Sequence, residues 1–270
     1  MAAFKDGKLA SGSYDKTIII WNVTTSKILK HLKGHTDWII SLVVLSNQIN
    51  LASGGWDKKI IIWDTSNGDI IQILRGHTNW IMSLSLLKDG YLASAGWDKN
   101  ILIWDPLSGY LIKSLNTHSE NHINSLAILS DGSLVSGSSS IKIWNTTTGN
   151  VIKVLNGHND SVSCLTVFRD DDTLASSSFD KTIILWNTTT GNMIGKLGGH
   201  SKWISSLLAL PNHILASGSL DGTILLWNKS NGEILRILKG HTGWVYSLVM
   251  IDSFTLASGS YDKTIIIWNL

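Results

Sequence analysis

Short apolar stretches recur along the whole chain, and each ends in a run of Gly, Asn, Asp or Ser. One period contains, in order, an apolar stretch at 38–45 (WIISLVVL), then LASGGWD, KIIIWD, a polar turn and IIQILRGH. Strands favour Ile, Val and Trp, whereas Gly, Asn and Asp are typical of the turns between them. The pattern therefore predicts four strands in each period, and no stretch shows convincing helical periodicity.

Seven tryptophans hold the same place in successive periods and define the repeat length. Their spacings are 42, 41, 40, 42, 41 and 41 residues. They are Trp21, Trp63, Trp104, Trp144, Trp186, Trp227 and Trp268. A fixed period of this length is typical of stacked units that bury their faces against one another. Because no linker or break in composition divides the chain, we expect residues 1–270 to form a single domain.

Composition and charge exclude several classes of protein. The 270 residues are 43% hydrophobic and 16% charged with only 2 Pro, which excludes a disordered or collagen-like chain. A net charge of +2 gives no general attraction to nucleic acid or membranes. No apolar run approaches the roughly 20 residues that span a bilayer. The single cysteine and the absence of a signal-peptide pattern favour a cytoplasmic location.

The motifs of each period resemble those of the WD-repeat β-propeller family. Gly-His opens a period, Ser-Gly-Ser-x-Asp-Lys-Thr or a close variant follows, and Trp-Asn or Trp-Asp closes it. The resemblance covers the whole chain and implies an all-β fold, a single β-propeller of four-stranded antiparallel blades. The near-identity of the units is similar to that in the propellers of multidomain signalling and incompatibility receptors.

The resemblance also implies a buried hydrogen-bond network in each blade. The network joins the His of Gly-His, a Ser of the second strand, the Asp of the next turn and the Trp of the third strand. The matching sets are His35, Ser53, Asp57 and Trp63; His77, Ser94, Asp98 and Trp104; His158, Ser176, Asp180 and Trp186; His200, Ser217, Asp221 and Trp227; and His241, Ser258, Asp262 and Trp268. Because the set recurs five times with a Trp attached, we expect a structural role rather than a catalytic triad. We therefore predict no catalytic residue, no metal site and no cofactor.

Two units depart from this pattern. The first has Ser11, Asp15 and Trp21 but no preceding Gly-His. In the fourth, Thr117-His118 replaces Gly-His, and 138–140 leads directly into the third strand without the Asp. We expect the fourth blade to be the least stable.

The two ends of the chain are redundant, because residues 9–22 recur identically at 256–269. We expect seven blades, of which the first is nearly whole and the last stops before its outer strand. The alternative is six blades, with the two identical segments competing for one position. Either arrangement leaves an edge or a spare segment that favours self-association or strand exchange.

Six further tryptophans are not explained by the blade pattern. Four stand three residues after the Gly-His histidine, at the start of the innermost strand: Trp38, Trp80, Trp203 and Trp244, with His122 and Ser161 in the fourth and fifth units. Two precede the turn Asp: Trp56 and Trp97, matched elsewhere by Tyr14, Phe179, Leu220 and Tyr261. In the family's geometry both positions lie on one face around the channel mouth, so the resemblance implies an aromatic binding surface. The alternative is that these rings pack between blades and extend the core.

A lysine follows the turn Asp in five units, at Lys16, Lys58, Lys99, Lys181 and Lys263. One explanation of these lysines is that they only increase solubility. The other is that they contact a ligand, in which case an acidic or phosphorylated peptide with an apolar anchor is favoured. We predict a non-enzymatic protein- or peptide-interaction scaffold, with no nucleic-acid or membrane partner. The candidate binding residues are Trp38, Trp80, Trp203, Trp244, Tyr14, Trp56, Trp97, Phe179, Tyr261, Lys58 and Lys99. The alternative is a lectin-like propeller that binds one sugar on each blade.

Overall fold

A computed structural model describes residues 1–116, 121–168 and 172–270. Within these residues the chain is all-β, and no helix long and apolar enough to span a membrane occurs. Seven antiparallel sheets follow one another along the chain, six with four strands and the last with three. This confirms the predicted β-propeller class and the choice of seven blades over six. The chain divides into two compact units, Met1–Leu126 and Ala127–Leu270.

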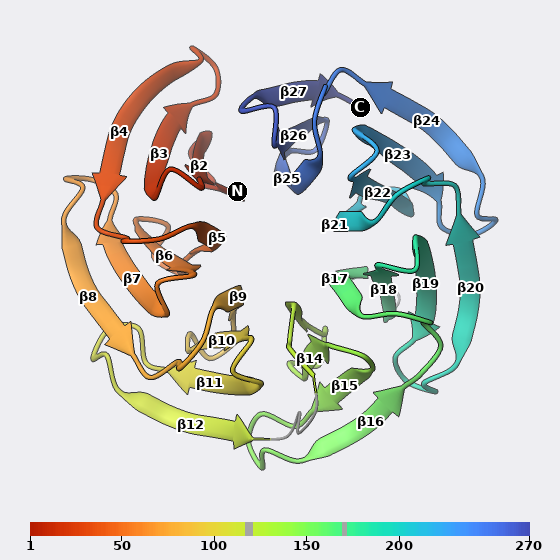
Figure 1. Ribbon diagram of the computed structural model, residues 1–270, viewed down its shortest axis with the longest axis horizontal. Coiled ribbons are helices and arrows are strands. Elements are labelled where there is room, and N and C mark those ends of the chain that lie inside the picture. The colour runs from red at the N-terminus through yellow and green to blue at the C-terminus, as the bar shows by residue number, and fades with distance from the viewer. Residues whose placement is uncertain (117–120, 169–171) are drawn as a thin grey trace. The chain divides into compact units, whose positions relative to one another are not determined.

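Unit 1 contains the first three blades (Figure 1). In each blade the strands pair in chain order, and the fourth is called the outer strand here. The strands are β1 (Ala2–Ala3), β2 (Lys8–Gly12), β3 (Thr17–Asn22) and β4 (Lys27–Lys33); β5 (Ile39–Val44), β6 (Asn50–Gly55), β7 (Lys59–Asp64) and β8 (Ile70–Arg75); and β9 (Ile81–Leu86), β10 (Leu92–Gly96), β11 (Asn100–Trp104) and β12 (Leu111–Asn116).

Unit 2 contains blades four to seven, and the boundary between the units falls within the first of their strands. The strands are β13 (Ser125–Ile128), β14 (Leu134–Gly137), β15 (Ile141–Trp144) and β16 (Val151–Leu155); β17 (Val162–Phe168), β18 (Thr173–Ser178), β19 (Thr182–Asn187) and β20 (Met193–Gly198); β21 (Ile204–Leu210), β22 (Ile214–Ser219), β23 (Thr223–Asn228) and β24 (Ile234–Lys239); and β25 (Val245–Asp252), β26 (Thr255–Ser260) and β27 (Ile265–Asn269).

The third strand of the second blade, β7, buries apolar side chains on both faces of its sheet. In β7, Ile60, Ile61 and Ile62 are all fully buried. Their burial requires neighbours on both faces of the sheet, and in unit 1 one cluster joins Ile60 and Ile62 to Leu84 of the third blade. No blade could bury this strand alone, which is why the second and third blades of unit 1 pack against each other.

Outer strands have a different pattern, with a single buried position among the side chains that the structure describes. It is a leucine in every case: Leu32, Leu74, Leu115, Leu155, Leu197 and Leu238. The remaining outer-strand side chains are mostly exposed and include at least one Lys or Arg per strand. Such charges discourage pairing of an exposed edge with other chains.

The two end blades agree with the sequence-based expectations. In the first blade, Ala2 pairs with Ala10 across β1 and β2, so this blade has all four strands. In the last, the sheet contains only β25, β26 and β27. The expected departure at Thr117-His118 lies outside the described residues.

Candidate partner-binding site

Each expected His–Ser–Asp–Trp set comes together as one network. In the second blade, His35 Nδ1 lies 2.9 Å from Asp57 Oδ2 and His35 Nε2 lies 2.7 Å from Ser53 Oγ. The indole nitrogen of Trp63 donates to the same Ser53 oxygen at 2.8 Å. The other four sets repeat these three contacts at 2.7 to 3.0 Å.

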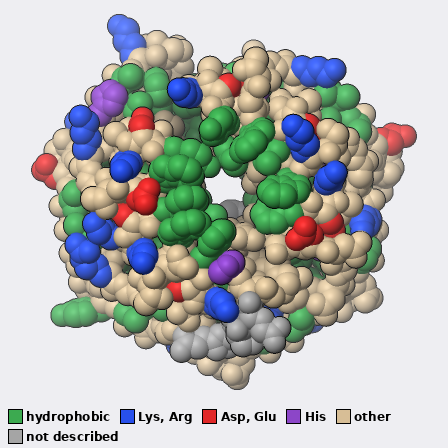
Figure 2. Space-filling view, viewed as in Figure 1, with side chains coloured by type: hydrophobic (Ala, Val, Ile, Leu, Met, Phe, Trp, Pro, Cys, Tyr) green, Lys and Arg blue, Asp and Glu red, His purple; other side chains and the backbone are tan. Residues whose placement is uncertain are grey.

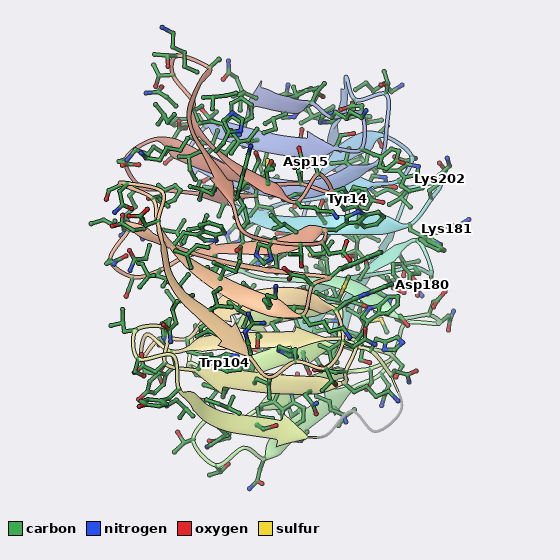
Figure 3. All side chains as sticks on the ribbon, turned by 60° about the vertical axis from the view of Figure 1, so that its left-hand side comes forward. Tyr14, Asp15, Trp104, Asp180, Lys181 and Lys202 are labelled. Carbon is green, nitrogen blue, oxygen red and sulfur yellow. The ribbon has the colours of Figure 1, made fainter. Side chains whose placement is uncertain are left out.

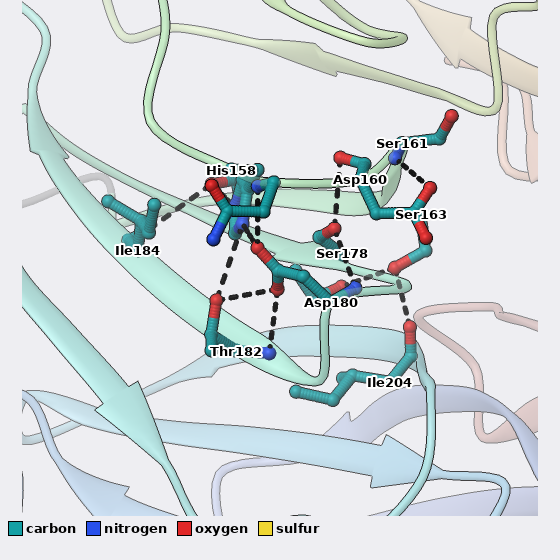
Figure 4. A network of polar contacts seen from close by, with 12 residues as sticks. His158, Asp160, Ser161, Ser163, Ser178, Asp180, Thr182, Ile184 and Ile204 are labelled. Carbon is teal, nitrogen blue, oxygen red and sulfur yellow. Dashed lines mark hydrogen bonds and ion pairs between the residues drawn. The ribbon is translucent and has the colours of Figure 1, made fainter.

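The fifth blade shows how the charges in such a network are held (Figure 4). Burial opposes ionisation of Asp180, but hydrogen bonds from Thr182, from the Asn159 backbone and from His158 outweigh it and lower its pKa to about 2. Burial lowers the pKa of His158 despite the nearby carboxylate. A neutral imidazole then donates a hydrogen bond from Nδ1 to the Asp180 carboxylate and accepts a hydrogen bond from the Ser176 hydroxyl at Nε2. Every polar group of the network is satisfied within the blade.

The glycine of Gly-His has a packing role in the same network. A Cβ on Gly76 would lie 2.8 Å from Cη2 of Trp104, and the other Gly-His glycines lie equally close to the Trp of their blade. The glycine therefore allows the indole to lie against the backbone. Each serine oxygen is hydrogen-bonded to the Trp and the His of its own blade, so each set links the second and third strands of that blade to the loop that carries the histidine.

The two irregular blades keep part of the network. In the first, Trp21 donates to Ser11 Oγ at 2.8 Å, and Asp15 accepts from Thr17 instead of a histidine. In the fourth, Trp144 donates to Ser136 Oγ at 2.9 Å. The sequence analysis did not assign Ser136, because it precedes its Trp by eight residues rather than the usual ten. The match of Leu-Val-Ser-Gly to Leu-Ala-Ser-Gly could have revealed it.

Outside the networks, unit 1 contains a continuous stack of six rings, which we call the aromatic ladder. Its members, in order, are Tyr14, Trp38, Trp56, Trp80, Trp97 and His122. Successive ring centroids lie 4.1, 4.2, 3.7, 4.5 and 4.5 Å apart. Trp56 and Trp80 are parallel, with an interplanar angle of 1°, whereas Trp80 and Trp97 are tilted by 37°. Unit 1 thus brings together all of its predicted aromatic positions and adds a histidine.

The backbone fixes the positions of the ladder rings. Trp38 directly precedes β5, and its carbonyl accepts from the backbone N–H of Trp56 in the turn between β6 and β7 at 2.8 Å. Trp80 and Trp97 repeat this contact in the next blade at 2.9 Å. A Cβ on Gly55 would lie 2.2 Å from the Trp38 carbonyl oxygen. The Gly before each turn Trp, where most other blades have Ser, is therefore part of the site.

Each ladder tryptophan has a ring on both sides, so its faces are covered and only edges reach the surface. The five aromatic residues before His122 are half-buried. The indole N–H groups of Trp56 and Trp97 are buried without an acceptor among the described residues. Leaving such a donor unpaired costs about 1 to 3 kcal/mol, so stacking rather than hydrogen bonding holds these two rings. Figure 2 shows hydrophobic side chains gathered over unit 1 and also over unit 2, with charged side chains bordering both groups.

In unit 2 the corresponding positions form two separate pairs. Phe179 lies 4.7 Å from Trp203, and Trp244 lies 5.2 Å from Tyr261, both tilted. Trp203 and Trp244 are 48% and 40% exposed, whereas the four ladder tryptophans are half-buried. The aromatic positions thus form one row within unit 1 and two separate pairs within unit 2. Aliphatic or small residues, Leu220 and Ser161, occupy the ring positions that would continue the stack.

The lysine after each turn Asp has a left-handed backbone. Its φ is 73° at Lys16, 65° at Lys58, 68° at Lys99, 69° at Lys181 and 69° at Lys263. In the sixth blade the equivalent residue is Gly222, with φ of 84°. A non-glycine residue is strained in this region, so lysine is kept five times where glycine fits better. Figure 3 shows two of these turns, at Tyr14 and Asp15 and at Asp180 and Lys181.

The described residues contain no group of three His, Cys, Asp or Glu side chains suited to hold a metal ion. Cys164, the single cysteine of the sequence, is only partly buried.

Comparison with protein families gives one match. The family described as WD domain, G-beta repeat matches residues 1–22, 26–64, 68–105, 109–145, 149–187, 191–228 and 232–269. Each matched segment after the first begins with the outer strand of one blade and ends with the third strand of the next blade. No curated protein matches the chain.

Proposed function

The chain belongs to the WD domain, G-beta repeat family, and we propose that it is a scaffold that binds a protein or peptide partner through the aromatic ladder of unit 1. Propellers of this family are generally protein-interaction scaffolds and typically not enzymes. The observation that carries the proposal is the six-ring stack itself. Unit 1 aligns the rings from successive blades in one continuous row.

A stacked row of rings is well suited to partner binding. Its side chains are already ordered, so a partner that docks against their edges loses little conformational entropy in fixing them. Tryptophan and tyrosine also dominate the binding energy of protein interfaces. The two unpaired N–H groups at Trp56 and Trp97 show that the arrangement costs stability. Such a cost at a surface patch is expected of a functional site.

The surroundings of the ladder favour an acidic partner with an apolar anchor. Lys16 and Lys58 are exposed in the turns that carry Tyr14 and Trp56, and Lys99 follows Trp97 in the same way. Their left-handed backbone is more costly than the glycine of the sixth blade. Retention of lysine therefore supports a role for its charge. A carboxylate or phosphate beside the anchor would interact with these ammonium groups.

The lectin-like alternative gains no support. A sugar ring stacks on an open aromatic face, but both faces of each ladder tryptophan are covered by neighbours. Equal sites on every blade would also require equivalent aromatic positions. The tryptophans are instead stacked in unit 1 and exposed in unit 2.

Selection from a random peptide library displayed on phage tests the proposal. We expect enriched peptides to combine Leu, Phe or Trp with Asp or Glu, and to bind more weakly as salt concentration rises. Calorimetry should show one site per chain. Binding should fall at least tenfold with Trp56→Leu and severalfold with Lys58→Gln.

Two variants of unit 2 serve as matched controls. Trp203→Leu removes an exposed tryptophan, and Lys181→Gln removes the same turn lysine from another blade; both should leave peptide binding unchanged. The proposal is wrong if the selected peptides bind Trp56→Leu as tightly as the parent protein, or if Trp203→Leu alone abolishes binding. Circular dichroism of every variant verifies that the fold is retained.

A further inference from the structure

The chain contains three Asn-Gly pairs, at 67–68, 156–157 and 231–232. An asparagine followed by glycine is chemically labile in water, because the glycine nitrogen can attack the side-chain amide carbon and no Cβ hinders its approach. Whether the attack occurs depends on the structure around each pair. It needs a glycine N–H and a carboxamide that are not already hydrogen-bonded, and a backbone that can bring them together.

The pairs at Asn67 and Asn231 are held in tight turns. Gly68 and Gly232 have left-handed backbones, with φ of 93° and 76°. Each glycine N–H donates at 2.8 Å to the carbonyl oxygen four residues earlier. Each asparagine Oδ1 accepts the backbone N–H two residues later, at 3.0 Å for Asn67 and 3.1 Å for Asn231. Both reacting groups are therefore already hydrogen-bonded, and the turns protect these two pairs.

The third pair, Asn156-Gly157, lies outside a strand because the fourth blade is irregular. In the other five four-stranded blades, the residue two places before the next unit's histidine ends the outer strand and pairs with the third strand: Lys33, Arg75, Asn116, Gly198 and Lys239. In the fourth blade the turn at 138–140 is shortened, and the pairing ends one residue earlier, at Ile141 opposite Leu155. Asn156 therefore follows the end of β16 and has no residue of β15 paired opposite it.

The reacting groups of this third pair are open to water. Asn156 and Gly157 are both exposed. Neither the Asn156 carboxamide nor the Gly157 N–H is hydrogen-bonded to any residue in the described part of the chain. The pair thus lacks the strand pairing of the other blades and both of the hydrogen bonds that hold the turn pairs. Of the three Asn-Gly pairs, it is the one whose glycine nitrogen is free to reach the side chain.

We propose that Asn156 is a site of spontaneous deamidation in the folded protein. The Gly157 nitrogen loses its proton to solvent and bonds to the side-chain amide carbon of Asn156. The bond from that carbon to the amide nitrogen breaks, and the nitrogen takes up a proton and leaves as ammonia. Water then opens the resulting succinimide ring at either of its carbonyl carbons, which yields aspartate or isoaspartate at position 156. The reaction consumes one water and needs no enzyme, oxidant or cofactor.

The isoaspartyl product alters the buried network of the fifth blade. A Cβ on Gly157 would lie 2.9 Å from Cη2 of Trp186, so this glycine already lies against the indole. The next residue, His158, contacts Asp180 at 3.0 Å and Ser176 at 2.8 Å (Figure 4). An isoaspartyl linkage adds the side-chain methylene to the main chain directly before this glycine. The longer backbone displaces the indole or the histidine and loosens the network. This reaction involves only residues of unit 2 and does not depend on the function proposed above.

Peptide mapping by mass spectrometry, after incubation of the full chain at neutral and at mildly alkaline pH, measures deamidation at all three pairs in one sample. We expect Asn156 to react at least tenfold faster than Asn67 or Asn231. Its rate should rise with pH, because the attacking nitrogen must lose its proton. In the urea-unfolded chain the three rates should become similar, since no turn then protects the other two pairs.

Three variants separate the reaction from its structural consequence. Asn156→Gln should abolish the reaction at this position, because glutamine would have to close a larger ring; Asn67→Gln is the matched control. Methylation by an isoaspartyl methyltransferase with a labelled methyl donor detects the product, and label should accumulate in the aged parent and in aged Asn67→Gln but not in aged Asn156→Gln. Asn156→Asp carries the product's charge without the longer backbone. Hydrogen exchange in β18 and β19 should therefore quicken severalfold in the isoaspartyl form but not in Asn156→Asp.

Three results would overturn the proposal. The first is deamidation of Asn156 in the folded chain no faster than that of Asn67 and Asn231. The second is an equally strong preference for Asn156 in the unfolded chain, since the fold would then not be its cause. The third is an aged parent chain that takes up no more methyl label than aged Asn156→Gln, since the succinimide route yields isoaspartate.

Discussion

The two units of this chain are built from the same repeat, yet their aromatic residues behave differently. In unit 1 six rings form one stack with centroids at most 4.5 Å apart. In unit 2 four rings form two separate pairs with centroids 4.7 and 5.2 Å apart, and Trp203 and Trp244 are 48% and 40% exposed. The buried His–Ser–Asp–Trp networks are the same in both. The repeated motif residues therefore determine the fold of each blade. The arrangement of the surface rings depends instead on two variable positions in each blade, the one before the innermost strand and the one before the turn Asp.

The largest expected effect is on the ladder itself. Trp56→Ala removes a half-buried ring that stacks on Trp38 and Trp80. We expect the free energy of unfolding to fall by about 3 kcal/mol. Tyr261→Ala removes a 57% exposed ring at the same position of the seventh blade and should cost less than about 1 kcal/mol. Urea denaturation measures both, and equal losses would contradict the distinction between the units.

The next effect concerns the His–Ser–Asp–Trp networks, which both units contain. Hydrogen bonds hold the pKa of Asp180 at about 2 against the effect of burial. A carboxyl whose pKa is lower in the folded than in the unfolded chain stabilises the fold above about pH 4, and this contribution is lost as the pH falls toward 2. Asp180→Asn should therefore cost about 2 kcal/mol at pH 7 and much less at pH 2.

Asp98 tests whether unit 1 shares this behaviour. Burial opposes its ionisation, but His77 and the backbone of Thr78 and Asn100 lower its pKa. Asp98→Asn should show the same pH dependence as Asp180→Asn in denaturation measured at several pH values. A pH-independent loss in either variant would mean that shape rather than charge matters in that network.

A smaller effect is expected at the glycines that precede the ladder tryptophans. Gly55→Ser places a Cβ against the Trp38 carbonyl and should displace the rings, at a cost of about 1 to 2 kcal/mol. The converse change in unit 2, Ser178→Gly, removes only hydrogen bonds of Ser178 with Asp160 and Asp180. It should cost about 1 kcal/mol. Near-ultraviolet circular dichroism, which reports coupled tryptophans, should change strongly only for Gly55→Ser.

The smallest effect is expected at the turn lysines and should be alike in both units. Lys58→Gly and Lys181→Gly relieve a left-handed lysine, so each should leave stability unchanged or raise it by up to about 1 kcal/mol. The reverse change, Gly222→Lys, should lower stability by a similar amount. Thermal denaturation measures all three. A loss of stability in the Lys→Gly variants would show that the lysine side chains stabilise the blades.

Most of the fold could be predicted from the sequence because the period is regular. The spacing of Trp21 to Trp268 placed the blades, and the overlap of 9–22 with 256–269 indicated the open last blade. The network residues followed from the family motif. Ser136 was missed because a shortened turn moved it out of the expected spacing.

The ladder could only partly be predicted from the sequence. The positions of Trp38 and Trp56 were singled out, but their stacking depends on contacts between blades that no local pattern records. It also depends on Gly55 and Gly96, which had been treated only as turn residues. The same positions in unit 2 give isolated pairs because Leu220 and Ser161 interrupt the row. Counting the aromatic residues at each repeat position could not distinguish one continuous row from separate pairs.

Fluorine nuclear magnetic resonance of the protein labelled with fluorinated tryptophan tests the central claim most directly. The chain has 13 tryptophans, which single Trp→Phe variants can assign. When a selected acidic peptide is added, the account predicts shifts for Trp38, Trp56, Trp80 and Trp97, with Trp203 and Trp244 unchanged. Shifts confined to Trp203 and Trp244, with the four ladder signals unmoved, would contradict it.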